Sequence, residues 1–320
     1  KKNFFEEIKN SSITINEIIN KQTFFNKKIK KNEKLFNQTL QKWKRISSKN
    51  DSNIFLQRLK KDNIKLKDIN SQLFSQTLKR NNNIKWDKNL EWIYESIQDK
   101  DYNNFRSKKA VYPFEDLYFN LIETAFLKLY KPKKFKFSKK VKTILLEDLL
   151  SKITTITQYA LYEEFLSFIK ISSNESKKNK NNYFYKLFTD YFRSNYIEKF
   201  FRKYPVLLRL LSTIVSQWLD SNNIFFKRLE KDSYKIFKQL NFRVNIISNI
   251  DISLSDPHNY GKSVYKIQNS SGKKILYKPK SLKTDYNFSK LIGKINNLNP
   301  PEKLMLPKVL YFNNYGWTEY

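Results

Sequence analysis

Residues 244–278, VNIISNIDISLSDPHNYGKSVYKIQNSSGKKILYK, decide the fold predicted for this chain. Apolar and polar residues alternate over 244–254, again over 263–267 and again over 274–278, which is the pattern of half-buried strands. The polar run at 269–272 ends in glycine and is typical of a tight turn between the last two strands. The stretch therefore predicts an antiparallel sheet.

The sequence after residue 278 adds a helix and two strands to this sheet. Apolar residues at helical spacing predict a helix over 286–295, and short apolar runs predict strands at 307–312 and 317–320 with a turn at 313–316. The predicted order is strand, glycine-containing loop, strand, turn, strand, helix, strand, strand. That is the order of elements in the small lobe of a protein kinase.

The chain before Asn241 is predicted to be helical. All four glycines and five of the eight prolines lie beyond residue 250, and these are the residues that stop helices and form turns. Apolar residues three or four positions apart form stripes over 114–129, 141–153 and 207–218, and Ser138 is placed to cap the second of these helices. Residues 1–110 are more polar, and we expect helices there that pack on the outside.

Composition excludes several classes of protein. The 320 residues contain no cysteine, which excludes disulfides and cysteine-ligated zinc, so we expect no zinc site. The single histidine, His258, excludes multi-histidine metal sites and limits a Ser-His-Asp hydrolase to that residue. No run of 18 apolar residues predicts a membrane span, and the N-terminus lacks the apolar core of a signal peptide, so we expect a cytoplasmic protein. The chain begins with lysine instead of methionine, which indicates a fragment.

The charge has two interpretations. Sixty-two Lys and Arg against 30 Asp and Glu give a net charge of +32. Such a charge can attract nucleic acid or an acidic peptide. However, only nine of the basic residues are Arg, and Asn, Ile, Phe and Tyr, which share AT-rich codons with Lys, are abundant. Because phosphate-binding surfaces usually rely on Arg, the composition favours mutational drift over a purpose-built basic surface.

Two residues could serve phosphoryl transfer. A kinase-like site needs a glycine-containing loop over the phosphates and a lysine on the third strand of the small lobe. Gly261 lies in the loop after the first strand, and Lys278 ends the alternating strand one hairpin later. The loop lacks the spacing of a Walker A motif. Spacing alone leaves open that Lys278 is an ordinary surface lysine, and that His258 is a loop histidine that caps backbone groups.

Several short segments together resemble one family, the dehydratase domain of class II lanthipeptide synthetases. They occur in the order of that family and span about residues 113–320. The segments are PFE at 113–115, YPVLLR at 204–209, Arg228-Leu229 with Asp232, SDPHNYGK at 255–262, YKPKSL at 277–282 and YGWTEY at 315–320.

The resemblance implies a lipid-kinase-like fold dressed with extra helices. The intact family enzyme uses ATP and Mg²⁺ to phosphorylate Ser and Thr of a ribosomal precursor peptide, then eliminates phosphate to leave dehydroalanine or dehydrobutyrine. By position, Lys278 matches the lysine that contacts the ATP phosphates, and Gly261 lies in the loop beside it. Asp256 and His258 match the active-site pair of the SDPH loop, which handles phosphate during transfer or elimination.

The resemblance has departures. The family usually has Arg where Lys280 stands, and no glutamate lies in the helix over 286–295, so the acidic partner of Lys278 stays open between Asp285 and Glu302. In the family, the catalytic and metal-binding residues of the large lobe come after the position of Tyr320. The resemblance therefore implies a truncated fragment that is inactive without the large lobe. A separate large-lobe or cyclase chain is a candidate partner, and the sequence leaves open whether such a partner completes the site.

The predicted domains are variable N-terminal helices at 1–110, a helical capping region at 111–242 and an incomplete kinase-like small lobe at 243–320. The expected partner is the precursor peptide, with its leader and core, and not nucleic acid. The alternative is a basic, non-catalytic helical module that binds an acidic leader peptide or nucleic acid.

Overall fold

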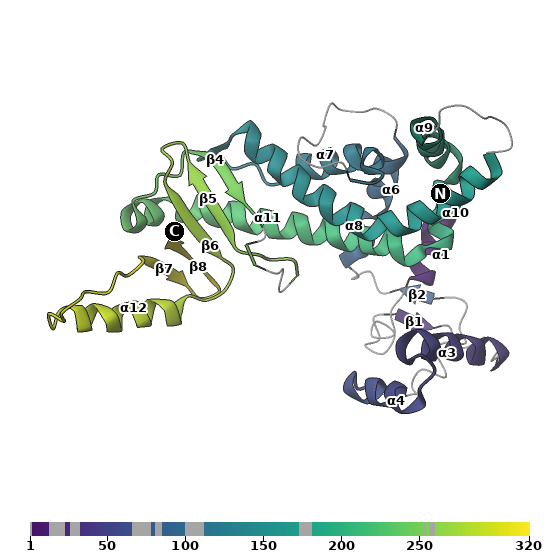
Figure 1. The fold of residues 1–320 in the computed structure, drawn as a ribbon, viewed down its shortest axis with the longest axis horizontal. Helices are drawn as coiled ribbons and strands as arrows, with labels where there is room; N and C mark the ends of the chain where they lie inside the picture. Colours follow the sequence, from purple (N-terminus) through teal and green to yellow (C-terminus); the bar gives the residue numbers. More distant parts are fainter. Residues whose placement is uncertain are drawn as a thin grey trace. The chain divides into compact units, whose positions relative to one another are not determined.

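The structure, a computed structural model, describes residues 2–12, 23–25, 33–65, 78–80, 85–99, 112–172, 181–252, 254–255 and 260–320 (Figure 1). Contacts between residues divide the chain into two compact units. The first unit comprises Lys1–Leu90 and Glu198–Arg209, and the second comprises Glu91–Ile197 and Leu210–Tyr320. The second unit contains the residues that the sequence singles out for chemistry.

The first unit is built from short helices and one small ladder. Its elements are α1 (Lys2–Ser11), β1 (Thr23–Phe25), α3 (Glu33–Ser48), α4 (Ser52–Lys61), β2 (Leu78–Arg80), the 3₁₀ turn η1 (Lys85–Asn89) and most of α10 (Ile197–Lys203). Strands β1 and β2 pair antiparallel. Trp43 of α3 meets the ring of buried Phe55 of α4 edge to face, and Asp51 caps α4 by accepting from the amides of its first turn.

Helices and helical turns make up most of the second unit outside the sheet. They are α6 (Leu90–Gln98), η2 (Glu115–Tyr118), α7 (Phe119–Leu127), α8 (Lys139–Ser172), α9 (Asn181–Tyr191), the π-helical turn η3 (Phe192–Tyr196) and α11 (Pro205–Leu240). The three stripes read from the sequence lie in η2–α7, α8 and α11, so these predictions are confirmed. Ser138 caps α8 as predicted, because its Oγ accepts from the amide of Val141 at 3.3 Å. Helix α11 ends at Leu240, which confirms the predicted boundary at Asn241.

A six-stranded sheet follows, with the order β3-β4-β5-β6-β8-β7. Its strands are β3 (Lys136–Phe137), β4 (Ile246–Asp251), β5 (Tyr265–Asn269), β6 (Lys274–Lys278), β7 (Val309–Phe312) and β8 (Tyr315–Glu319). All pairs are antiparallel except β3 with β4, which is parallel. The chain is therefore a mixed α/β protein with a mostly antiparallel sheet, and the short helix α12 (Lys283–Asn296) packs beside β7.

The strand boundaries differ from the sequence predictions in instructive places. Strand β6 occupies the residues predicted for it, whereas β5 begins at Tyr265, two residues later than expected, because the amide of Val264 bonds the Ser255 hydroxyl at 3.2 Å. Strand β4 ends at Asp251, so Ile252, predicted as part of it, lies outside the strand. Strand β8 begins at Tyr315, so the turn before it is shorter than predicted.

Helix α11 covers one face of the sheet, as Figure 1 shows. The ring of Phe225 lies 4.6 Å from that of Tyr265, 5.1 Å from that of Tyr277 and 6.2 Å from that of Trp317, between ring centroids. All four side chains are buried. Alternate residues of β5, β6 and β8 thus form one aromatic core with α11, and the residues between them face the other side of the sheet.

Across the described ranges, no helix has both the length and the apolar character that crossing a membrane requires.

Candidate functional site

Lys278 lies at the end of β6, on the sheet face that α11 does not cover. Its neighbour Tyr277 is buried in the aromatic core, and alternation along the strand turns Lys278 to the opposite face. The Lys278 side chain is 27% exposed, and its Nζ lies 3.6 Å from Oδ1 of Asp285. The acidic partner that the sequence left open is therefore Asp285, in the first turn of α12. Glu302 is exposed and lies beyond the end of that helix.

Gly316 explains why α12 brings Asp285 to Lys278. Gly316 pairs with Lys278 across the β6–β8 ladder. A Cβ atom added at Gly316 would lie 2.6 Å from Cδ1 of Leu282 and 2.9 Å from the carbonyl oxygen of Leu310. The missing side chain thus leaves the space that the fully buried Leu282 fills. Because Leu282 immediately precedes α12, this contact fixes the first turn of the helix, which carries Asp285.

The loop between β4 and β5 leaves and re-enters the sheet at the same end as Lys278. Register pairs Asp251 with Lys266, and Tyr265 with Tyr277, so the end of β4, the start of β5 and the end of β6 share one sheet edge. The predicted site residues Asp256 and His258 belong to this loop and lie outside the residues that the structure describes.

Gly261 lies among the described residues at the end of this loop, where its backbone comes close to Gln217 of α11. It has a φ of +79°, in the left-handed region, and a Cβ added there would lie 3.2 Å from Cβ of Gln217. Both the backbone conformation and the close approach to the helix favour glycine at this position. The structure therefore gives Gly261 a local structural role. Its role in a phosphate loop stays a prediction.

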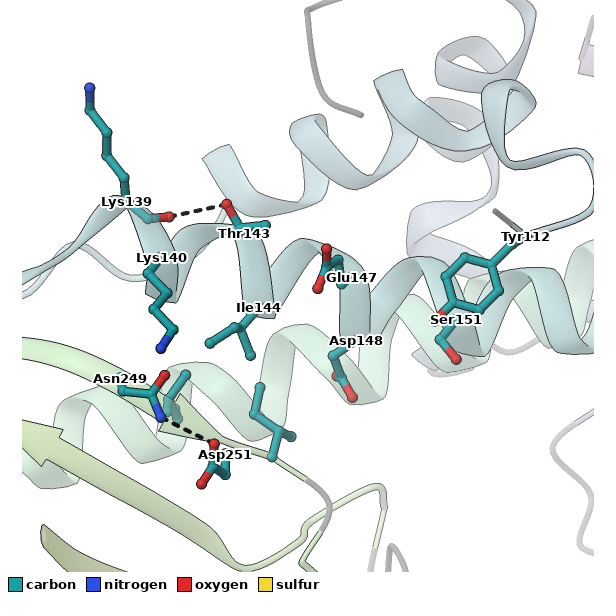
Figure 2. A pocket seen from close by; sticks show the side chains of 12 residues that line it. Tyr112, Lys139, Lys140, Thr143, Ile144, Glu147, Asp148, Ser151, Asn249 and Asp251 are labelled. Atoms are coloured by element: carbon teal, nitrogen blue, oxygen red, sulfur yellow. Dashed lines mark hydrogen bonds between the residues drawn. The ribbon is translucent and has the colours of Figure 1, made fainter. Parts of the chain in front are cut away.

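Two cavities flank the described ends of this loop. The larger, of about 720 Å³, lies between α8 and β4, and the smaller, of about 340 Å³, lies between α8, α11 and Gly261. Asp148 and Ser151 of α8 line both of them. Figure 2 shows the larger cavity, where Lys140 and Ile144 point toward β4.

Two carboxylates that line these cavities, those of Asp148 and Asp251, have hydrogen-bond partners. Asp148 accepts from Lys152 Nζ at 2.5 Å and from Trp218 Nε1 at 3.1 Å. Asp251 accepts from Asn249 Nδ2 at 3.1 Å, and Lys266 Nζ lies 2.6 Å from its Oδ2. The hydrogen bond from Lys266 is the main cause that lowers the pKa of Asp251, so this carboxylate stays ionised.

Sequence reasoning missed Asp148 and Asp251 as parts of the site. Asp251 is the last residue of a strand and Asp148 lies mid-helix, so no short motif marks either of them. Among the described residues, no group of three or more His, Cys, Asp or Glu gathers as a metal site would.

Residues Arg228 and Asp232, which belong to the segments that carry the family resemblance, brace the sheet from α11. The Arg228 guanidinium lies 3.9 Å from the ring centroid of Tyr315 and donates to the hydroxyl of Tyr277 at 2.6 Å. Asp232, which is buried, accepts from Trp317 Nε1 at 2.9 Å. Burial is the main cause that raises the pKa of both Tyr277 and Tyr315, so both stay neutral. Arg228 and Asp232 thus hold the sheet that carries Lys278.

The segment PFE at 113–115 also has a packing role. Phe114 is buried and stacks on the ring of Tyr185 with centroids 5.5 Å apart. Glu115 accepts the amide of Tyr112 at 2.9 Å, and burial raises its pKa more than this bond lowers it. This segment therefore supports the helical part of the unit.

Comparison with known protein families gives a match over part of the chain. A search of curated proteins found none that is similar to this chain. Residues 204–320, which include α11, the sheet from β4 onward, Gly261, Lys278 and Asp285, match the model of a family described as a domain of unknown function, DUF4135.

Proposed function

We propose that residues 246–319 form the nucleotide-binding small lobe of a kinase-like peptide dehydratase, as in class II lanthipeptide synthetases. The complete enzyme phosphorylates Ser and Thr of a ribosomal precursor peptide with ATP and then eliminates the phosphate. The observation that carries the proposal is the Lys278–Asp285 pair at the sheet edge where the loop with Asp256 and His258 begins and ends. The association of DUF4135 with lanthipeptide synthetases supports it.

In this proposal Lys278 holds the phosphates of ATP. Its ammonium is partly exposed, so it can contact an anionic ligand without being taken out of a buried ion pair. The 3.6 Å separation from Asp285 leaves room for the ammonium to turn while Asp285 keeps it near the sheet edge. A positioned ammonium offsets the negative charge that spreads over the transferred phosphoryl group.

Asp256 and His258 are the proposed groups for proton handling. A histidine near neutral pH can donate a proton to the departing phosphate oxygen during elimination. A carboxylate two residues earlier can orient the imidazole. Gly261, held against Gln217, fixes the end of the loop that carries them.

Mg²⁺, bound together with ATP, would offset the negative charge of the phosphates. The described residues offer no cluster of acidic ligands for it, so no step is assigned to the metal here. In the proposed enzyme, those ligands come from a large lobe.

The proposal is tested on this chain joined to a large lobe that carries those ligands. We expect Lys278→Met to abolish peptide phosphorylation. We expect His258→Ala to accumulate phosphorylated peptide, because elimination needs its proton more than transfer does. Asp256→Ala should fall between them. Mass spectrometry of the peptide separates the substrate, the phosphorylated and the dehydrated forms.

The matched control is Lys274→Met, which removes a lysine from the same strand and the same sheet face, four residues from Lys278 and away from Asp285. It should phosphorylate as the parent does. Normal phosphorylation by Lys278→Met would refute the small-lobe assignment. Full dehydration by His258→Ala at the parent rate would leave the lobe assignment standing and remove the proposed role of His258.

A further inference from the structure

Helix α12 presents an apolar face that no described residue covers. Phe288, Leu291 and Ile295, at helical spacing, are 60%, 55% and 40% exposed, whereas Ile292, at one edge of the same face, is 8% exposed. Three large apolar side chains on one stripe are unusual for a surface helix, because such a stripe normally packs on a core. The core-facing side of α12 is already in place through Ile292 and Leu282.

Two hydrogen bonds hold the segment after α12 beside the end of the helix. The side chain of Asn296 makes two hydrogen bonds to the backbone of Leu304, donating to its carbonyl at 2.9 Å and accepting from its amide at 3.0 Å. These bonds hold Leu304, which is 56% exposed, beside the C-terminal end of α12. Met305, which follows Leu304 in the chain, is 97% exposed, and Leu298, two residues after Asn296, is 82% exposed.

Lysines line one flank of the stripe. Because a helix completes a turn every ~3.6 residues, Lys283, Lys290 and Lys294 fall together along one side of Phe288, Leu291 and Ile295. All three lysines are exposed, and none of the ion pairs among the described residues includes them; Lys290 Nζ lies 4.7 Å from the ring centroid of Tyr286. The one acidic residue of α12, Asp285, pairs with Lys278.

We propose that this α12 surface, formed by Phe288, Leu291, Ile295, Leu298, Leu304 and Met305 with the lysine flank, docks an acidic amphipathic helix of another polypeptide. The apolar side of the partner helix covers the stripe, and carboxylates along its edge pair with Lys283, Lys290 and Lys294. Charge complementarity selects this occupant. The inference does not depend on the proposed phosphoryl transfer.

The same charges disfavour other occupants. In an antiparallel two-fold pairing with a second copy of this chain, the lysine flank of one α12 would face the lysine flank of the other. A membrane-bound helix carries basic residues along both edges of its apolar face. On α12 the lysines follow one edge, and the other edge leads to Asn296 and the bonded segment.

The test uses the full 320-residue chain as bait for a display library of randomised single-helix peptides. Selected peptides should be amphipathic and rich in Asp and Glu on one edge. Fluorescence anisotropy then measures the affinity of a selected peptide. Leu291→Ser should weaken binding at least about tenfold, the loss typical of an interface anchor. Lys294→Glu should weaken it severalfold, and less at high salt.

The matched control is Leu127→Ser, which changes a leucine that is 64% exposed on α7. It should bind the peptide as the parent chain does. Both leucines are exposed, so both variants should keep the melting temperature of the parent.

Four outcomes would overturn the proposal. The first is that the library yields no binder or yields binders without an acidic edge. The second is that Leu291→Ser binds like the parent chain. The third is that the chain binds phosphatidylglycerol vesicles through α12 more tightly than any selected peptide. The fourth is a dimer in sedimentation that Leu291→Ser dissociates.

Discussion

The two faces of the six-stranded sheet differ in their residues and in what those residues contact. On the face toward α11, Tyr265, Tyr277 and Trp317 are 3% exposed or less and share one aromatic core with Phe225. On the opposite face, Lys266 and Lys278 occupy alternate positions of the same strands and pair with carboxylates, and Lys266 Nζ also lies 4.7 Å from the ring centroid of Tyr320.

The difference between the faces separates stability from chemistry. Burial of large aromatic side chains supplies much of the folding free energy, whereas partly exposed ion pairs contribute little to it. A lysine on the charged face can therefore change its partner without loosening the sheet. The predictions below test whether the two faces are separable in this way.

The largest effect is expected from Trp317→Ala. Trp317 is fully buried, its ring centroid lies 4.9 Å from that of Tyr277, and its Nε1 donates to Asp232. The variant leaves a cavity and removes one hydrogen-bond donor from the buried carboxylate of Asp232, so the free energy of unfolding should fall by about 3–5 kcal/mol. Urea denaturation followed by circular dichroism measures it. Trp317→Phe keeps most of the ring and should lose less; a loss below about 1 kcal/mol for the alanine variant would contradict the aromatic core.

The next largest effect is expected from Gly316→Ala, because Gly316 pairs with Lys278 and leaves the space that Leu282 fills before α12. The added methyl would collide with Leu282 and with the carbonyl oxygen of Leu310, so we expect a loss of about 1–3 kcal/mol. The variant should also move the start of α12, and with it Asp285, away from Lys278. Alanine at Gly293, where nothing lies within 4 Å of an added Cβ, is the matched control and should be neutral or stabilising. Equal stability of the two variants would show that Leu282 does not need the space at Gly316.

A smaller effect is expected from Arg228→Lys. The lysine keeps the positive charge and loses the planar contact with Tyr315 and the directed bond to Tyr277. We expect a loss of about 1–2 kcal/mol of unfolding free energy. A double-mutant cycle with Tyr277→Phe separates the hydrogen bond from the stacking. Additive losses in that cycle would mean that the bond to Tyr277 contributes nothing.

The smallest effect is expected on the charged face. The hydrogen bond from Lys266 holds the pKa of Asp251 below its ordinary value of 3.8, so Lys266→Met should raise that pKa toward 3.8. The stability from this pair is fully present above the unfolded pKa and is lost as pH falls through the lower, folded pKa. A carboxyl NMR titration measures the shift. Lys274→Met should leave the titration unchanged, and an unshifted Asp251 in Lys266→Met would refute the pairing.

Local patterns in the sequence predicted the elements that depend on local interactions. The alternation of Lys274–Lys278 gave β6 with its boundaries, and the stripe over 207–218 identified α11, because side-chain periodicity is set within each element. The sequence also placed Lys278 at a strand end. It did not decide between Asp285 and Glu302, because that choice depends on the packing of Leu282 against Gly316, a contact between distant strands.

Local sequence patterns likewise could not predict that Arg228 and Asp232 contact the aromatic residues of the sheet. The resemblance to a family marked both residues, and only the fold shows that they contact Tyr277, Tyr315 and Trp317. Asp256 and His258 stay predictions, since they lie outside the described residues.

The parallel pairing of β3 with β4 has a consequence for the order in which the protein forms. The amide of Ser138 bonds the carbonyl of Ile247, and its hydroxyl bonds the carbonyl of Ser248, 110 residues later. A ribosome that adds ~5–20 residues per second needs roughly 5–20 s to make the chain between these partners. Helices with local contacts form in far less time. We therefore expect the start of α8 to be helical before the strand that completes its N-terminal anchor has been synthesised. Closure of this long loop is expected to limit the folding rate.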